Sequence, residues 1–345
     1  MKKSNNPLLY PLSWLYGLGV GLRNFLFNQG ILKQQSYPIP LICVGNITVG
    51  GTGKTPHVEL LISILRKQYR IAVISRGYKR KSRGLREVTL TSTAEEVGDE
   101  PKQIKQKYPE VRFVVDGNRR RAMRYLLALP EEERPEVVLL DDGFQHRYVQ
   151  PSFNILLIDA QRELHDDELL PLGGLREPAT ARYRADCIIL TKCPHDMPPI
   201  KLRIMQRNLD LYAHQEIFFS RIHYQHPCAV RTLLGEAGSP LPKDALVIAL
   251  SGIASPGLFF SYLAERYELI DQLVYPDHHQ FRRKDFTAIS ERWQELCEQH
   301  SGRPVYIVCT EKDAVRFTDS LGELPEELVK QLYFLPIETQ ILYKP

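Results

Sequence analysis

A glycine-rich run between an apolar segment and a helical pattern constrains the fold of this chain more than any other feature. The run is GNITVGGTGKTP at 45–56; it follows apolar residues at 40–44 and precedes a helix-like stretch at 57–67. Glycines let backbone N–H groups approach phosphates closely, and the amino end of the next helix adds positive potential. The order strand, loop and helix therefore predicts a phosphate-binding loop (P-loop).

The P-loop pattern gives individual residues a role. Lys54 would reach the β- and γ-phosphates of a nucleotide, and the Thr55 hydroxyl would bind Mg²⁺. The usual pattern has a glycine where this chain has Thr48, so the run is closer to the variant x-G-G-x-G-K-T. A plain glycine-rich turn is the structural alternative, but the loop and both flanking elements favour nucleotide binding. The residues expected around the phosphates are Thr48, Val49, Gly50, Gly51, Thr52, Gly53, Lys54 and Thr55.

Length and charge limit the domain number and the partners. The 345 residues allow one large or two medium domains. The formal net charge is only +4, so we expect no nucleic-acid partner. None of the six cysteines has C-x-x-C spacing, which indicates reduced thiols in a cytosolic compartment.

Short apolar runs alternate with helical patterns along the chain, which predicts an α/β fold. The runs are nearly continuous in apolar residues, as in parallel strands buried on both faces. The strands expected first are 40–44, 70–75, 111–115, 137–141, 153–158 and 186–191, and a second set is 216–222, 245–250, 268–275, 304–309 and 332–337. We expect two α/β/α layered domains with mainly parallel sheets: a P-loop NTPase-like domain at 29–215, and a smaller α/β domain at 216–345 that closes over a cleft.

The amino-terminal segment, 1–28, carries an uncharged run over 5–22. Prolines and glycines interrupt this run, so it is a poor membrane span. Tyr10, Trp14 and Tyr16 suit the membrane–water interface. We therefore expect a helix that lies in the interface; a helix packed on the sheet is the alternative.

Two pairs of adjacent acidic residues are candidates for catalysis or metal binding. Asp141 and Asp142 end an apolar run, where P-loop enzymes carry the carboxylate that supports Mg²⁺. Asp99 and Glu100 precede Pro101, which is expected to begin a helix. A carboxylate there could accept a proton from an attacking hydroxyl, although acidic residues are also common in the first turn of a helix.

Two basic segments could bind anionic groups. Five basic residues lie within 76–83, among them Arg76 and Arg80. Arg176 lies in the glycine-containing segment 172–178. Phosphate on a substrate, ATP or an anionic membrane would each suit such residues, and a solvated basic loop or a structural turn is the alternative.

The run Asp277, His278, His279 allows a metal site, an acid–base pair or a polar loop. It suggests a metal-dependent phosphoesterase as one alternative function, but such enzymes need further Asp and His clusters. A P-loop ATPase or GTPase that switches a partner protein is the main alternative, since the variant P-loop is common in that class.

Taken in order, the motifs resemble the tetraacyldisaccharide 4′-kinase (lipid A 4′-kinase) family of Gram-negative bacteria. The resemblance covers nearly the whole chain. The matching segments are GNITVGGTGKTP at 45–56, SRGYKRK at 75–81, GDEP at 98–101, DDGFQH at 141–146, GGLREP at 173–178, SGIASP at 251–256, PDHHQF at 276–281 and TEKDAVRF at 310–317.

The resemblance implies an enzyme that transfers the γ-phosphoryl group of ATP to the 4′-hydroxyl of a tetraacyl disaccharide 1-phosphate. The product is lipid IV-A, and the reaction requires Mg²⁺ at the cytosolic face of the inner membrane. By resemblance, Asp99 would be the base, and His278 or His279 would polarise it. Thr55 with Asp141 or Asp142 would hold Mg²⁺, with help from Glu100. Arg76, Arg80 and Arg176 would contact the substrate.

Overall fold

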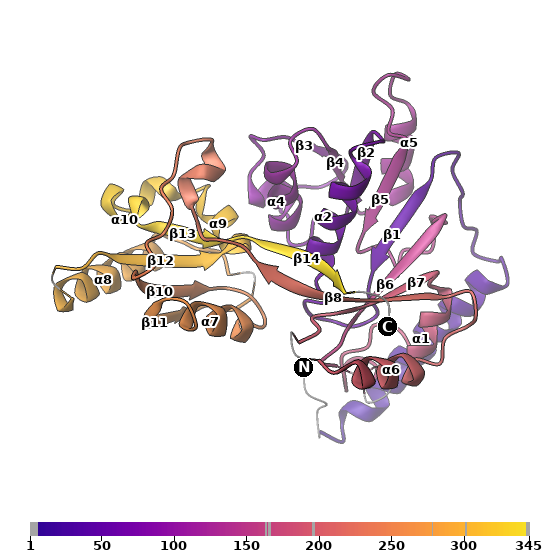
Figure 1. Cartoon of the computed structure of the whole chain (residues 1–345). Coiled ribbons are helices and arrows are strands. Elements are labelled where there is room, and N and C mark those ends of the chain that lie inside the picture. Colours follow the sequence, from indigo (N-terminus) through magenta and orange to yellow (C-terminus); the bar gives the residue numbers. More distant parts are fainter. Residues whose placement is uncertain are drawn as a thin grey trace.

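The computed structural model describes residues 6–162, 164, 167–194, 197–277, 279–300 and 302–342. Its named strands form two separate sheets, one of nine strands and one of five. Figure 1 shows the two sheets in two bodies, with strands β8 and β14 lying between them. Both sheets are mainly parallel, which confirms the predicted α/β fold class.

The nine-stranded sheet has the order β14-β8-β7-β6-β1-β5-β2-β4-β3. Only the pairs β14–β8 and β3–β4 are antiparallel. The strands are β1 (Leu41–Gly45), β2 (Ile71–Ser75), β3 (Arg86–Val88), β4 (Arg112–Val115), β5 (Val137–Asp141), β6 (Phe153–Asp159), β7 (Cys187–Thr191), β8 (Glu216–Tyr224) and β14 (Ile337–Leu342). Because β1, β5, β6 and β7 are parallel neighbours, the loops that follow them meet at one edge of the sheet.

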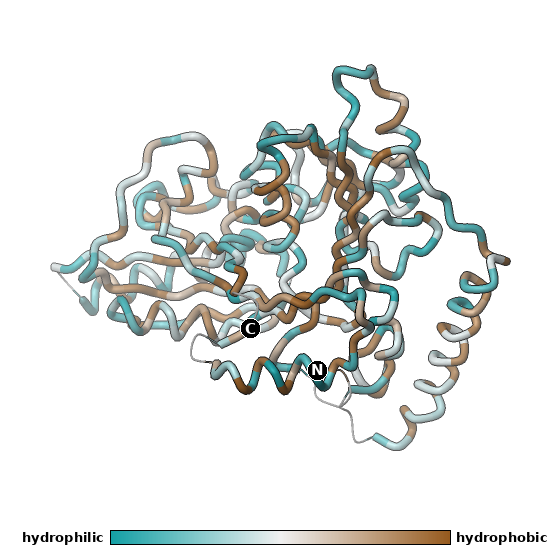
Figure 2. The backbone as a smooth tube through the Cα atoms, turned by 45° about the vertical axis from the view of Figure 1, so that its right-hand side comes forward, coloured by the Kyte–Doolittle hydropathy of each residue, from teal (hydrophilic) through white to brown (hydrophobic). Residues whose placement is uncertain are grey.

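Helices cover both faces of this sheet. Apolar residues of α2 and α4 pack on one face, and those of α5 and α6 pack on the other. The central strands are the most continuously hydrophobic part of the chain in Figure 2, as expected for strands buried on both faces. The helices are α1 (Leu9–Asn28), α2 (Lys54–Leu65), α3 (Ala94–Val97), α4 (Asp99–Lys107), α5 (Arg119–Leu127) and α6 (Pro199–Asn208).

The five-stranded sheet has the order β11-β10-β12-β13-β9, and only β9 is antiparallel to its neighbour. Helix α7 packs on one face, while α8, α9 and α10 pack on the other. The elements are β9 (Cys228–Ala229), β10 (Leu246–Ser251), α7 (Gly257–Ala264), β11 (Glu268–Val274), α8 (Arg283–Gln299), β12 (Val305–Thr310), α9 (Glu311–Phe317), α10 (Glu326–Lys330) and β13 (Leu332–Leu335).

The boundary predicted at 215 does not coincide with the change of sheet. Strand β8 pairs in parallel with β7, and β14 returns to pair with β8, so both strands belong to the first sheet. The physical reason is that Ile217 and Phe219 of β8 are buried in the first core. The five-stranded sheet is therefore an insertion between β8 and β14.

The expected amino-terminal helix is present as α1. Its large apolar side chains are mostly exposed, including Trp14 at 78% and Leu18 at 70%. Phe27 is buried near the end of α1, where its ring meets Tyr148 edge-on. Among the described residues, none of the helices combines the length and apolar character that crossing a bilayer requires.

A buried histidine joins the P-loop helix to β8. The Nδ1 atom of His57 lies 2.7 Å from the Gly53 carbonyl oxygen, and its Nε2 lies 2.9 Å from the Ser220 hydroxyl. Because a carbonyl only accepts, Nδ1 carries the proton and Nε2 accepts from Ser220. Burial lowers the pKa of His57 to about 4, against a small opposing effect of the Gly53 hydrogen bond.

We expect His57 to make folding stability depend on pH. Between its folded pKa of about 4 and an unfolded pKa of about 6.5, the unfolded chain binds a proton that the folded chain does not. The contribution of His57 to the free energy of unfolding is fully present above pH 6.5. As the pH falls toward 4, the free energy of unfolding decreases by up to about 3 kcal/mol. Urea unfolding of wild type and His57→Gln at pH 7 and pH 4.5 should show a smaller pH effect in the variant. An equal pH effect in both proteins would contradict this assignment.

Candidate active site at the carboxyl edge of the first sheet

The predicted P-loop runs from the end of β1 into α2. Gly53 caps α2 with φ +82°, in the left-handed region that favours glycine, and Lys54 is the first residue of the helix. Thr55 follows in the first turn. The segment therefore has the strand–loop–helix geometry that presents backbone N–H groups to phosphates.

Neighbouring segments brace the P-loop. The Val49 N–H donates to the Gly174 carbonyl at 2.7 Å, and the Arg162 guanidinium donates to the Val49 carbonyl at 3.0 Å. On the other side, the Thr191 hydroxyl at the end of β7 donates to the Thr52 carbonyl at 3.0 Å. The loop is thus held in shape by the segment 173–178 and by the strand β7.

Lys54, Asp142 and Arg176 form a charge cluster beside the P-loop. The Lys54 Nζ lies 3.6 Å from Asp142 Oδ1 and 3.5 Å from the Asn46 Oδ1. The Arg176 Nη1 donates to both Asp142 oxygens at 3.3 Å. Burial alone would raise the pKa of Asp142, but Lys54 and Arg176 outweigh it and hold that pKa below its usual range.

Asp141 has a different environment from its neighbour. It is almost fully buried at the end of β5, and burial, followed by the charges of Glu100 and Asp142, raises its pKa to about 7. Its Oδ1 atom has no hydrogen-bond partner in the described part of the chain. A buried, unsatisfied carboxylate oxygen fits a cation ligand, because Mg²⁺ prefers oxygen ligands and usually takes only one or two carboxylates.

The predicted metal ligands do not form a preassembled metal cluster. No group of three or more His, Cys, Asp or Glu side chains among the described residues has the geometry to hold a metal ion. Mg²⁺ commonly keeps waters and nucleotide phosphates as its other ligands, so the residues present still fit this ion. Of the predicted ligands, Glu100 and Asp142 lie near enough to Asp141 for their charges to raise its pKa.

Asp99 and Glu100 lie at the start of α4 and face the five-stranded sheet with its helices, which is called the second domain from here on. The Asp99 Oδ2 lies 2.8 Å from Nη2 of Arg316, and the Glu100 Oε1 lies 3.2 Å from Nζ of Lys312. Both partners are on α9. The structure therefore places the predicted base and the predicted auxiliary metal ligand where the two domains meet.

The two basic residues of the 76–83 loop have different surroundings. Arg76 is exposed. Arg80 is half-buried, and its guanidinium donates to the carbonyls of Val115 at 3.2 Å and Gly84 at 2.5 Å. Arg80 thus holds its own loop, which leaves Arg76 better placed to meet an anion.

Arg119 is a candidate residue that the sequence did not indicate. It begins α5 and is only 4% exposed, and burial lowers its pKa while the charges of Asp142 and Asp141 oppose that effect. The pKa of His146 is lowered to about 4 by burial and by nearby arginines, foremost Arg119. These effects indicate a positive region beside the two aspartates. The sequence did not indicate a role for Arg119, because a run of three arginines, at 119–121, is typical of a solvated helix face.

His279 does not join the P-loop cluster. Its Nε2 lies 3.1 Å from Asp285 Oδ2, near the start of α8, and its ring stacks on Tyr275 with centroids 4.9 Å apart. His278 lies outside the described residues.

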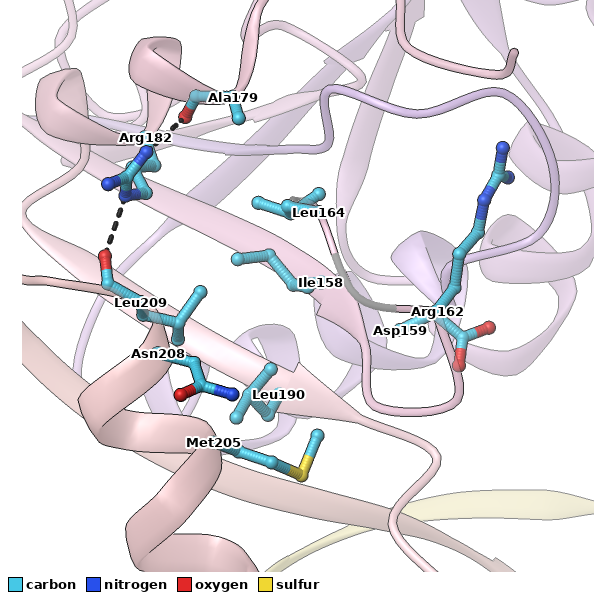
Figure 3. Close-up of a pocket in the computed structure, with 10 residues that line it drawn as sticks. All are labelled: Ile158, Asp159, Arg162, Leu164, Ala179, Arg182, Leu190, Met205, Asn208 and Leu209. Atoms are coloured by element: carbon cyan, nitrogen blue, oxygen red, sulfur yellow. Dashed lines mark hydrogen bonds between the residues drawn. The ribbon is translucent and has the colours of Figure 1, made fainter. Parts of the chain in front are cut away.

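A separate, mainly apolar pocket lies between β6, β7 and α6 (Figure 3). Arg182 closes one side, where it donates to the carbonyls of Leu209 at 2.7 Å and Ala179 at 3.0 Å. Arg162, which also braces the P-loop, lies on the opposite side. The pocket is lined by Ile158, Asp159, Arg162, Leu164, Ala179, Arg182, Leu190, Met205, Asn208 and Leu209, and so by none of the predicted site residues that the structure describes.

Together, the parallel sheet, the P-loop at its carboxyl edge and the Lys54–Asp142 contact define a P-loop nucleotide-binding enzyme. Residues 5–345 match the family model described as LpxK, tetraacyldisaccharide-1-P 4′-kinase, and the chain belongs to this family. The family predicted from the motifs is thereby confirmed.

Similar proteins cover nearly the whole chain. A tetraacyldisaccharide 4′-kinase of Porphyromonas gingivalis is 48% identical over 98% of this chain and 93% of its own length. That of Parabacteroides distasonis is 47% identical over 96% of this chain and 89% of its own length. The crystal structure of LpxK from Aquifex aeolicus, described as an "apo" form in complex with ATP, has a TM-score of 0.72 and 28% identity, and covers 96% of this chain and 93% of that one.

We expect Gly174→Ala to weaken ATP binding. A Cβ at this position would lie 1.7 Å from Nη2 of Arg162, so the guanidinium must leave the Val49 carbonyl that it holds. Loss of one charge-assisted hydrogen bond to the P-loop should raise the dissociation constant for ATP about tenfold, measured by calorimetry. Gly257→Ala is the control, because its Cβ would meet no atom within 4 Å. Equal affinities in both variants would show that Arg162 does not shape the loop.

Proposed function

We propose that the chain catalyses transfer of the γ-phosphoryl group of ATP to the 4′-hydroxyl of a tetraacyl disaccharide 1-phosphate. The observation that carries this proposal is the Lys54–Asp142–Arg176 cluster at the P-loop of a chain that belongs to the 4′-kinase family from residue 5 to residue 345. The names of the relatives supply the acceptor, and the geometry of the site supports phosphoryl transfer.

The P-loop backbone and Lys54 would bind the phosphates of ATP. Phosphoryl transfer depends mainly on positioning and on neutralising charge, and a cationic lysine at the amino end of α2 serves both. Mg²⁺ would be held by Thr55 and Asp141 or Asp142, with Glu100 nearby, and it would supply further charge neutralisation. Lys54 leaves its contact with Asp142 when it turns to the phosphates, and Arg176 then remains to pair with that carboxylate.

Asp99 would accept the proton of the sugar hydroxyl. It lies in the first turn of α4, close to the second domain. The influence of Glu100 on the pKa of Asp141 indicates that this turn is close to the proposed metal ligands. Arg76, Arg119 and Arg176 would attract the anionic groups of the two substrates.

Helix α1 would bring the enzyme to the cytosolic face of the inner membrane, where the lipid acceptor resides. One side of α1 is docked: the Ser13 hydroxyl donates to the Leu169 carbonyl and the Tyr16 hydroxyl to the Arg176 carbonyl, both at 2.8 Å. The other side exposes Trp14, Leu18 and other large apolar residues, which an interfacial helix can bury among lipids.

The test is transfer of labelled γ-phosphate from ATP to the tetraacyl disaccharide 1-phosphate in detergent micelles, with and without Mg²⁺. We expect Mg²⁺-dependent labelling of the lipid. Lys54→Ala should lower labelling at least about 100-fold, because charge neutralisation at the phosphates is lost. Asp99→Ala should lower kcat about 100-fold and change the KM for ATP little, because it removes an interaction of the reacting hydroxyl. ATP hydrolysis without labelled lipid would instead favour a partner-switching ATPase.

Replacing exposed apolar residues of α1 should weaken membrane binding. We expect Trp14→Gln combined with Leu18→Gln and Leu22→Gln to reduce sedimentation with vesicles of anionic phospholipid at least about tenfold, because apolar area that lipids would cover is removed. Affinity for ATP should not change. Ile64→Gln, at an exposed apolar residue of α2, is the matched control. Unchanged sedimentation of the triple variant would mean that α1 does not contact the membrane.

A further inference from the structure

The carboxylate of Asp99 is held by a guanidinium of the second domain. The Arg316 Nε donates to Asp99 Oδ2 at 2.9 Å, and its Nη2 lies 2.8 Å from the same oxygen. Arg316 is on α9 and its side chain is only 5% exposed, whereas that of Asp99 is 21% exposed. The contact therefore joins a buried cation of one domain to a partly accessible carboxylate of the other.

Buried hydrogen bonds with Asp313 and Gly252, together called the bracket, fix the other side of the Arg316 guanidinium. Its Nη1 donates to Asp313 Oδ1 at 2.7 Å and to the Gly252 carbonyl at 3.2 Å. Asp313 is completely buried, and its Oδ2 accepts from the Thr310 hydroxyl at 2.6 Å and from the Gly252 N–H at 2.8 Å. With its far side held in this way, the planar guanidinium meets Asp99 in one orientation.

The bracket accounts for two motifs to which the sequence gave no role. Gly252 belongs to SGIASP, and Thr310, Asp313 and Arg316 belong to TEKDAVRF. A Cβ on Gly252 would lie 2.8 Å from Asp313 Oδ1 and 3.4 Å from Arg316 Nη1. Glycine is therefore the residue that lets the β10 loop close on the Asp313–Arg316 pair.

We propose that Arg316 is a positioning residue of the second domain that orients the carboxylate of Asp99 toward the acceptor hydroxyl. The proposal rests on the proposed role of Asp99 as the base. Arg316 does not touch the substrates in this assignment; it fixes the carboxylate that does. It follows that the base is correctly oriented only while α9 lies against α4, so the second domain contributes to the chemistry through the Arg316 side chain.

The same two helices are joined by ion pairs that do not involve Asp99, and one of them provides a control. The Lys102 Nζ lies 2.5 Å from Asp319 Oδ1, just beyond the end of α9. Asp319→Asn removes this ion pair from the interface and leaves the bracket of Arg316 unchanged. A general loosening of the domains would affect Asp319→Asn and an Arg316 variant alike.

The experiment is a double-mutant cycle on lipid phosphorylation by the full-length protein, with Arg316→Ala, Asp99→Ala and the double variant. We expect Arg316→Ala to lower kcat about 30-fold with the KM for ATP within about twofold of wild type. In the Asp99→Ala background, the same change should lower kcat by less than about twofold, because the group that Arg316 positions is gone. Arg316→Lys, which keeps the charge but loses the planar fork, should still lower kcat about tenfold.

The outcomes separate this inference from the proposed function. Full activity of Asp99→Ala would overturn the role of Asp99 itself. A strong loss in Asp99→Ala with full activity in Arg316→Ala would overturn only the role of Arg316. Losses that multiply in the double variant, or an equal loss in Asp319→Asn, would also overturn it. Removing Arg316 leaves Asp313 buried without its cation, so Arg316→Gln, whose amide can still donate to Asp313, replaces Arg316→Ala if that variant does not fold.

Discussion

Two adjacent carboxylates at the end of one buried strand determine how the rest of the site is built. Asp141 and Asp142 lie close together in a poorly hydrated place, where two uncompensated charges repel each other strongly. Lys54 and Arg176 hold the pKa of Asp142 below its usual range against the effect of burial, and Asp141 has a pKa raised to about 7 by burial and by its acidic neighbours. Asp142 also adopts a backbone φ of +49°, which is unfavourable for a residue other than glycine. The P-loop on one side and the segment 173–178 on the other are the sources of the cations that offset these costs.

The connection between the two domains is electrostatic as well as covalent. Strands β8 and β14 carry the chain across, and a largely buried set of charges lies where β14 begins. The Lys107 Nζ lies 2.6 Å from Glu59 of α2 and 3.3 Å from Glu311 of α9, and Glu311 also accepts from the Ile337 N–H at 3.2 Å. Burial, followed by the charge of Glu311, raises the pKa of Glu59 to about 7 despite Lys107. The P-loop helix therefore shares one cation with the second domain, and a movement between the domains would alter the environment of both glutamates.

Local patterns in the sequence were sufficient for the P-loop and for the strands β1, β2 and β4 to β7 of the first sheet, because continuous apolar runs and a glycine-rich turn before a helix are seldom compatible with a different fold. They did not predict the short strand β3 or the edge strand β14. They were insufficient for β8, whose apolar residues fit either sheet; its place depends on pairing with β7 and β14, and β14 is far away in the chain. Arg119 and Arg316 were missed for a related reason. Arg119 stands in a run of three arginines and Arg316 follows the charged run 311–313, so both look solvated in the sequence. Only the packed structure shows both side chains buried, with Arg316 against Asp99 and Asp313. His279 illustrates the reverse case, since its type and position suggested chemistry while its acidic contact is Asp285, away from the P-loop.

The docking of α1 indicates how a membrane-bound acceptor would reach this edge of the sheet. The residues that hold α1 contact the loops that carry the site: Tyr16 binds the backbone of Arg176, and Arg23 donates to the Gln145 carbonyl at 2.5 Å, in the loop that follows Asp142. These contacts are made to backbone carbonyls, so they hold the loops at a fixed position relative to α1 that does not depend on the side chains of the loops. If α1 lies in the interface as proposed, Arg176 and the carboxylates lie at a set distance from the lipid headgroups. The substrate would then need to rise from the bilayer only far enough for its sugar to meet the P-loop edge, while its acyl chains remain among the lipids.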